Sequence, residues 1–175
     1  PRGGVGGGPV VNQAWDIVAT PVGPLTVVVD GDGRLVQVRF GESRGAAGRD
    51  PGRCAEVSGQ LLEYFGRQRR RFELQLAPDG SDFQQRVWRE VAAIPYGETR
   101  SYGEVAGRLG GGAVARAVGL ANATNPIPIV IPCHRVVGAD GALVGYGGGL
   151  AVKAALLRLE GATLASLGQL TLDLG

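Results

Sequence analysis

The pattern of hydrophobic and polar positions divides this chain into a strand-rich first part and a helix-rich second part. In the first part, short runs of alternating or continuous apolar residues are typical of β-strands. The two runs that flank Asp30-Gly31-Asp32-Gly33 have the turn signal of a β-hairpin. Apolar residues at helical spacing predict a helix over 53–65, after a Gly-rich loop over 41–52. The predicted strands are residues 15–20, 25–29, 35–40 and 72–76.

A change of composition at 77–80, Ala-Pro-Asp-Gly, marks the boundary between the two parts. Beyond it, Ser81 and Ser101 each stand three residues before a Gln or Glu, which is the spacing of a capping box at the start of a helix. The second of these helices is followed by the glycine run 110–112 and a third helical pattern, an outline typical of a helix-turn-helix. Helices are predicted over 81–94, 102–109, 113–123 and 150–159.

The segment before the last predicted helix cannot itself be helical where it holds Pro126, Pro128 and Pro132. Its other residues are mostly apolar, so we expect it to be buried. We expect it to run extended through the interior and to deliver Cys133 there. A turn at Asp140-Gly141 is expected in the stretch that follows.

Composition narrows the class of protein. The 175 residues are 44% hydrophobic, which is typical of a globular chain, and no apolar run approaches the ~20 residues that span a bilayer. One histidine and two cysteines cannot supply the nitrogen and sulfur ligands of a closed zinc site. The net charge of +2, with Lys153 as the only lysine, permits nucleic-acid binding without demonstrating it. We interpret the arginine-rich stretch 67–71 as a solvated surface.

The strongest chemical signal is that the only histidine, His134, directly follows one of the two cysteines, Cys133. A free thiol has a pKa of about 8.5 and reacts as a thiolate, so a neighbouring imidazole can activate it by taking its proton. Adjacent side chains on an extended chain point to opposite sides, so we expect a water molecule to bridge the two groups. The imidazole also needs an orienting acid, and Glu160 at the end of the last predicted helix is the candidate.

Each of these residues also has a purely structural interpretation: a small buried cysteine, a satisfied core histidine, and a solvent-facing acid at a helix end. The surrounding motifs decide against it. Asn125-Pro126 and the run 131–137, Ile-Pro-Cys-His-Arg-Val-Val, resemble the active-site signature of the O6-alkylguanine-DNA alkyltransferases. The resemblance covers about 81–161, with a weaker match over 14–76. Further motifs in the family's order are Phe-Gln-Gln-Arg-Val-Trp at 83–88, Ile-Pro-Tyr-Gly-Glu-Thr at 94–99, Ser-Tyr-Gly at 101–103, Arg-Ala-Val-Gly at 116–119 and Gly-Gly-Leu-Ala-Val-Lys at 148–153.

The resemblance implies a single-use DNA repair protein. Its thiolate, Cys133, would take the alkyl group from O6 of a guanine flipped out of double-stranded DNA and keep it as a thioether. O4-alkylthymine is a further substrate that the resemblance allows. By residue match, His134 is the base acting through water and Glu160 orients it. Asn125 would hold the active-site turn, and Tyr102 would donate a proton or hydrogen bond to the leaving guanine.

The same match implies how DNA and the flipped base are held. The helix-turn-helix would bind the minor groove, and Arg116 would fill the space of the flipped base. The matched DNA-contact residues are Ser101, Tyr102, Arg116, Ala117, Gly119 and Arg135. The matched pocket residues are Pro128, Val136, Tyr146 and Gly147, with the Gly147 amide near O6 and the carbonyls of Cys133 and Val136 on the exocyclic amine. Leu120 stands where many members have a glycine, and Gly147 stands where some have a serine.

The implied fold is α+β. A small N-terminal α/β domain, with ribonuclease H-like strands plus a helix, precedes a mainly helical C-terminal domain with the helix-turn-helix. We place a flexible Gly-rich tail at 1–12, the N-terminal domain at 13–78, the C-terminal DNA-binding and active-site domain at 79–165, and a tail at 166–175. No cofactor, metal or membrane is implied, and we expect a cytoplasmic, nucleoid-associated monomer.

Three alternative functions remain open on the sequence. A cysteine hydrolase would need an oxyanion hole and turnover, and it would leave the helix-turn-helix and Arg116 unexplained. A non-catalytic binder of alkylated DNA would lack the acceptor that Cys133 supplies. A sequence-specific regulator would need a dimer or a set of base-reading side chains, of which the sequence gives no sign.

Overall fold

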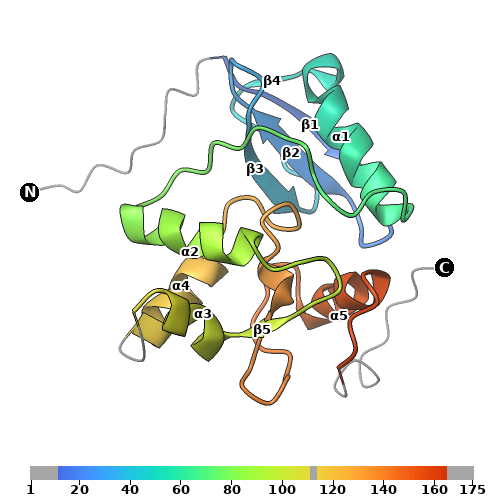
Figure 1. Ribbon diagram of the computed structural model, residues 1–175. Helices are drawn as coiled ribbons and strands as arrows, with labels where there is room; N and C mark the ends of the chain where they lie inside the picture. Colours follow the sequence, from blue (N-terminus) through green and yellow to red (C-terminus); the bar gives the residue numbers. More distant parts are fainter. Residues whose placement is uncertain (1–11, 111–113, 165–175) are drawn as a thin grey trace, which may run out of the picture.

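The computed structural model describes residues 12–110 and 114–164, and its first group of elements is a sheet covered by a helix (Figure 1). The sheet has the strand order β3-β2-β1-β4. β2 pairs antiparallel with both of its neighbours, whereas β4 runs parallel to β1. The first three strands confirm the sequence prediction to within two residues at each end. The strands are β1 (Ala14–Val18), β2 (Leu25–Val29), β3 (Leu35–Phe40) and β4 (Gly48–Arg49).

The helix on this sheet is α1 (Pro51–Phe65), which begins two residues earlier than predicted. Asp50 explains the earlier start, because its side chain accepts a hydrogen bond from Arg53 N and so caps the first turn. Pro51 then occupies a first-turn position, where its missing N–H costs nothing. The predicted loop over 41–52 therefore contains β4 and the start of α1.

The strand predicted over 72–76 does not form. A single bridge joins Leu35 to Leu76, and the rest of the stretch is irregular. The reason lies in α1, where the Gln60 side chain takes the place of a strand partner. Its Nε2 donates to Glu73 O at 3.1 Å, and its Oε1 accepts from Glu73 N at 2.9 Å. The backbone N–H and C=O of Glu73 are thus already satisfied, and only Gln75 and Ala77 pair with Leu35 of β3.

The second group of elements is mainly helical and lies below the sheet in Figure 1. Both predicted capping boxes form, and they begin α2 and α3. α2 packs on α3 and α4, and Trp88 of α2 donates a hydrogen bond to Ala121 O at 2.8 Å. None of the helices in the described ranges is long and apolar enough to cross a membrane. The elements are α2 (Asp82–Ala92), β5 (Arg100–Ser101), α3 (Tyr102–Arg108), α4 (Ala115–Ala123), β6 (Val136–Val137) and α5 (Leu150–Leu159), with β5 and β6 paired in parallel.

The segment 125–132 is buried as predicted, but it turns instead of running extended. Ile127, Ile129 and Ile131 are all buried, and Ile131 N donates to Ile127 O at 2.9 Å. Ile129 has a φ of 73°, in the left-handed region that a β-branched residue rarely adopts. Val38 N of β3 donates to Pro126 O at 2.9 Å, which ties this turn to the sheet. The sheet and the helical group are therefore joined next to Cys133.

Candidate active site

Cys133, His134 and Arg135 form one 3₁₀ turn, η2 (Cys133–Arg135), and not the extended chain that the sequence predicted. The turn sends three successive side chains into different surroundings. Cys133 is a free thiol and lines a cavity. The His134 side chain is completely buried, and the Arg135 guanidinium lies against Glu160. One short turn therefore carries both the candidate nucleophile and its candidate base.

His134 is held by the buried carboxylate of Glu160. His134 Nε2 lies 2.8 Å from Glu160 Oε1, and Arg135 donates to both carboxylate oxygens at 2.8 and 2.9 Å. Burial alone would raise the pKa of Glu160, but His134 and Arg135 lower it to about 2. Glu160 is thus ionised at neutral pH, which fixes the Nε2–H tautomer of the ring. His134 Nδ1 is buried and has no hydrogen-bond partner among the described residues.

The resting thiol and imidazole are both neutral. Burial raises the pKa of the Cys133 thiol, against the lowering effects of the Asn125 side chain and the Lys153 charge. Burial also lowers the pKa of His134, against the raising effect of Glu160. A neutral imidazole can accept a proton, and the adjacent carboxylate then stabilises the imidazolium. This arrangement allows His134 to take the proton of Cys133 and so to form the thiolate when the thiol reacts.

Asn125 holds the turn that carries the cysteine. Its Nδ2 donates to Ile131 O at 2.8 Å, and its Oδ1 accepts from Ile127 N at 2.9 Å. One side chain thus closes the loop from both ends. Asn122, at the end of α4, adds a longer contact of 3.4 Å from its Nδ2 to Cys133 O. Sequence reasoning missed Asn122, since only the fold places α4 against the turn.

Lys153 is the second residue that sequence reasoning missed. It is completely buried near the start of α5, and its Nζ donates to Val136 O at 2.6 Å and to Val144 O at 3.0 Å. Desolvation lowers the pKa of Lys153 to about 8, although the nearby Cys133 raises it. The one feature of the sequence that could have indicated its importance is that Lys153 is the only lysine of the chain. A buried cation beside the thiol favours the thiolate form.

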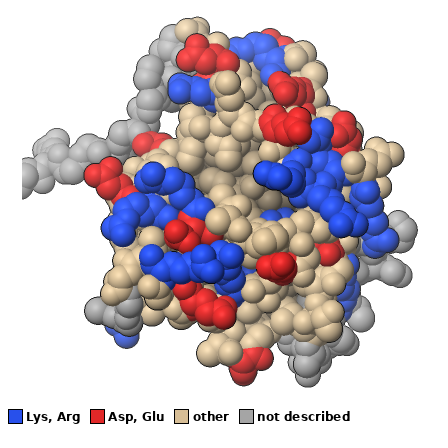
Figure 2. Space-filling model, in the orientation of Figure 1, with Lys and Arg blue, Asp and Glu red and all other residues tan. Residues whose placement is uncertain are grey.

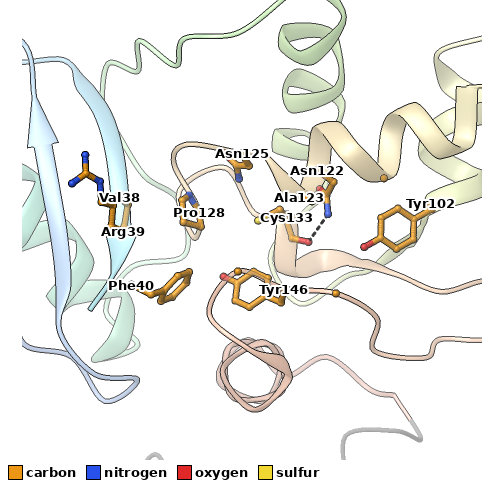
Figure 3. A pocket seen from close by; sticks show the side chains of 13 residues that line it. Val38, Arg39, Phe40, Tyr102, Asn122, Ala123, Asn125, Pro128, Cys133 and Tyr146 are labelled. Atoms are coloured by element: carbon orange, nitrogen blue, oxygen red, sulfur yellow. Dashed lines mark hydrogen bonds between the residues drawn. The ribbon is translucent and has the colours of Figure 1, made fainter. Parts of the chain in front are cut away.

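The thiol opens into a cavity of about 580 Å³ between the two groups of elements (Figure 3). Five of the residues predicted for the site line it together with Cys133: Tyr102, Asn125, Pro128, Tyr146 and Gly147. Gly119, predicted as a DNA contact, lines it as well. The sheet closes the opposite side through Val38, Arg39 and Phe40 of β3, a contribution the sequence did not indicate. The Phe40 and Tyr146 rings meet edge to face, with centroids 5.5 Å apart.

Two predicted site residues lie elsewhere. Arg135, expected to contact DNA, is 7% exposed because its guanidinium is fully engaged by Glu160 and by Ile94 O. Val136, expected to line the pocket, is completely buried outside the cavity, and its carbonyl accepts from Lys153 Nζ. Both residues differ from their predicted roles because the turn Cys133–Arg135 and the residue after it are buried.

The other predicted DNA-contact residues are accessible. Arg116 and Ala117 are exposed on α4, and Ser101 and Tyr102 are half-buried at the start of α3. In the arginine-rich stretch, Arg67, Arg70 and Arg71 are exposed, as predicted for a solvated surface. Figure 2 shows the molecule from one side, where basic side chains form separate groups with acidic side chains among them.

This chain is similar to known proteins in sequence and in fold. Residues 82–162 match the family model described as 6-O-methylguanine DNA methyltransferase, DNA binding domain. The methylated-DNA–protein-cysteine methyltransferase of Mycobacterium tuberculosis H37Rv is 48% identical over 147 residues, which are 82% of this chain and 89% of that protein. The chain belongs to the methylated-DNA–protein-cysteine methyltransferase family.

Further members support the same assignment. The Methanosarcina acetivorans member is 43% identical and covers 84% of this chain and 97% of its own length. The crystal structure of M. tuberculosis OGT in complex with DNA superimposes with a TM-score of 0.79 at 48% identity, covering 86% of this chain and 93% of that one. The α+β fold expected from the sequence is therefore confirmed, and so is the family that the motifs indicated.

Proposed function

We propose that this protein repairs DNA by transferring an alkyl group from O6 of guanine to Sγ of Cys133, irreversibly and once per molecule. The observation that carries the proposal is a free cysteine at a cavity, on the same turn as a histidine that a buried carboxylate orients. The names of the relatives point to the same reaction. O4-alkylthymine is a second substrate that the same chemistry allows.

The reaction follows from the side chains around the thiol. The Cys133 proton passes to His134 Nδ1, directly or through a water, and Glu160 stabilises the imidazolium. Sγ then attacks the alkyl carbon, so the S–C bond forms while the C–O6 bond breaks and its electron pair goes to the guanine ring. Tyr102, at the cavity wall, donates a proton or hydrogen bond to that ring, and Asn125 keeps the turn in place.

The product explains why the protein acts once. A thioether has no leaving group that water displaces readily, so Cys133 is consumed as a substrate. A soft, polarisable thiolate is the side-chain nucleophile best suited to displacement at an alkyl carbon. A cysteine hydrolase would need free hydrogen-bond donors around a developing oxyanion, whereas the Asn122 amide and the Lys153 ammonium next to the turn already donate to the carbonyls of Cys133 and Val136.

We also propose that α3 and α4 form a helix-turn-helix that binds double-stranded DNA through the minor groove. α4 supports this with an outer surface that combines the exposed Arg116, Ala117 and Leu120. An arginine beside small and apolar side chains suits a narrow groove and the gap that a flipped base leaves. Gly119 links that surface to the cavity. On this proposal the protein acts as a monomer on chromosomal DNA in the cytoplasm, with domains that meet near 77–80.

An intact-mass measurement tests the reaction. The protein is mixed with duplex DNA that contains O6-methylguanine, and Cys133→Ala serves as the matched control. We expect one added methyl group on the wild-type chain and none on the variant. A folded, DNA-binding protein without an adduct would instead indicate a non-catalytic lesion binder. Methyl release over many cycles would indicate a hydrolase.

A further inference from the structure

We propose that Tyr64 of α1 is a positioning residue for alkyl transfer, because its hydroxyl fixes the carboxylate that orients His134. The inference rests on the proposed function and deepens it. It connects the sheet-and-helix part of the chain to the reacting thiol through Glu160 and His134. Tyr64 lies 96 residues before Glu160 in the sequence, so only the fold brings the two together.

Glu160 Oε1 is an acceptor shared by Tyr64, His134 and Arg135. Tyr64 Oη donates to Glu160 Oε1 at 2.7 Å, and the same oxygen lies 2.8 Å from His134 Nε2. Arg135 adds a contact of 2.8 Å to Oε1 and one of 2.9 Å to Oε2. The carboxylate can therefore rotate only by breaking several charge-assisted hydrogen bonds. Tyr64 is the donor that comes from α1.

The Tyr64 hydroxyl can act as a rigid anchor because its ring cannot move freely. The side chain is completely buried. Its ring packs against Phe65, Phe72 and Tyr96, with centroid distances of 5.2, 5.4 and 6.2 Å. Aromatic packing of this kind holds the phenol in one orientation, so the O–H points at Oε1 without a further entropic cost.

The hydroxyl also moderates the charge that His134 experiences. A donor on Oε1 draws negative charge toward itself, so less is left to stabilise an imidazolium. Removing the O–H should make His134 easier to protonate in the free protein and leave the carboxylate less firmly placed. The other ionisable groups that surround His134 keep their positions; they are Arg135, Lys153, Cys133 and Tyr146.

The test compares Tyr64→Phe with Tyr96→Phe in single-turnover methyl transfer across a range of pH. Tyr96 is the matched control, since its hydroxyl belongs to the same aromatic cluster but donates to Leu159 O at 3.2 Å. For Tyr64→Phe we expect a rate about 10-fold lower at neutral pH, the scale that outer-shell partners of functional histidines reach in metal sites. We also expect the acidic limb of the pH profile to move to higher pH. Tyr96→Phe should leave the limb in place.

Several outcomes would overturn the inference. A Tyr64→Phe profile that matches wild type does so, and so does a drop in rate with an unmoved limb, which indicates a structural role only. If Tyr64→Phe does not fold, 3-fluorotyrosine at position 64 keeps the ring and strengthens the donor, and the limb should then move to lower pH; an unmoved limb again refutes the role. Failure of the proposed function looks different, because wild type itself would then form no adduct.

Discussion

Arg135 offers the sharpest test of the site, because the family resemblance implies that it contacts DNA and the structure buries it. Its guanidinium donates to Ile94 O at 2.6 Å and to both oxygens of Glu160. Arg135→Met keeps most of the stem's packing volume and removes the charge. Glu160 then remains buried with only the Tyr64 and His134 contacts. Removing one partner of a buried ion pair lowers the free energy of unfolding by about 3–5 kcal/mol, because the other charge stays buried without compensation.

That cost converts into a measurable melting shift. For a domain of this size, 1 kcal/mol corresponds to roughly 2–4 °C in Tm, so Arg135→Met should melt roughly 6–20 °C below wild type. Thermal unfolding measures the shift, and duplex binding at two salt concentrations measures the DNA contribution. Arg116→Ala is the control, since that side chain is exposed on α4. It should weaken DNA binding while changing the free energy of unfolding by less than about 0.5 kcal/mol.

The opposite pattern would refute this reasoning. At a temperature where Arg135→Met is folded, it should bind duplex DNA with the affinity and salt dependence of wild type. A variant with an unchanged Tm and a salt slope smaller by about one phosphate contact would place the guanidinium on DNA. The buried network described above would then be wrong.

Three further predictions address the carboxylate, the cavity wall and the buried cation. Because the folded pKa of Glu160 is about 2 and its ordinary value is 4.5, the unfolded chain takes up the proton first as pH falls. The free energy of unfolding should therefore decrease between about pH 4.5 and pH 2, and denaturant titrations should show that this part of the decrease is missing in Glu160→Gln. A Cβ on Gly148 would lie 3.0 Å from the Phe40 ring, so Gly148→Ala should destabilise the fold by about 1–3 kcal/mol in the same assay. Gly147→Ala, with nothing within 4 Å of its Cβ, should cost less; equal losses would contradict the contact. Lys153→Met removes the cation near the Cys133 thiol, so alkylation of Cys133 by iodoacetamide at pH 7 should slow. An unchanged rate would show that the Lys153 charge does not affect the reactivity of the thiol.

The sequence predicted the elements whose causes are local. The hairpin strands, both capping boxes and α5 follow from patterns within a few neighbouring residues, and the structure confirms them. Gly161 ends α5 with a φ of 75°, as its position suggested. In the site, the contact between His134 and Glu160 was expected and is present. The family motifs contributed most to that expectation, because spacing alone could not pair residues 26 positions apart.

The errors share a physical cause, which is that a distant side chain decides a local outcome. Residues 72–76 alternate like a strand, yet Gln60 satisfies the backbone of Glu73 and the ladder does not form. Arg135 lies in a motif next to the nucleophile, yet Glu160 draws it into the interior. No pattern in the sequence indicates that Tyr64 completes the same carboxylate. These contacts exist only once two parts of the chain have packed together.

On the proposed function, the burial of Cys133 fits a nucleophile that reacts once. Burial raises the pKa of Cys133 and lowers that of His134, so in the resting protein the proton stays on sulfur. A neutral thiol inside the cavity is a weaker target for oxidants and stray electrophiles than an exposed thiolate would be. An enzyme with turnover must regenerate its nucleophile in every cycle, but a thioether product makes no such demand. On the proposed mechanism, the site keeps Cys133 neutral until an alkylated base fills the cavity, and the carboxylate held by Tyr64 and Arg135 then stabilises the charge that appears on His134.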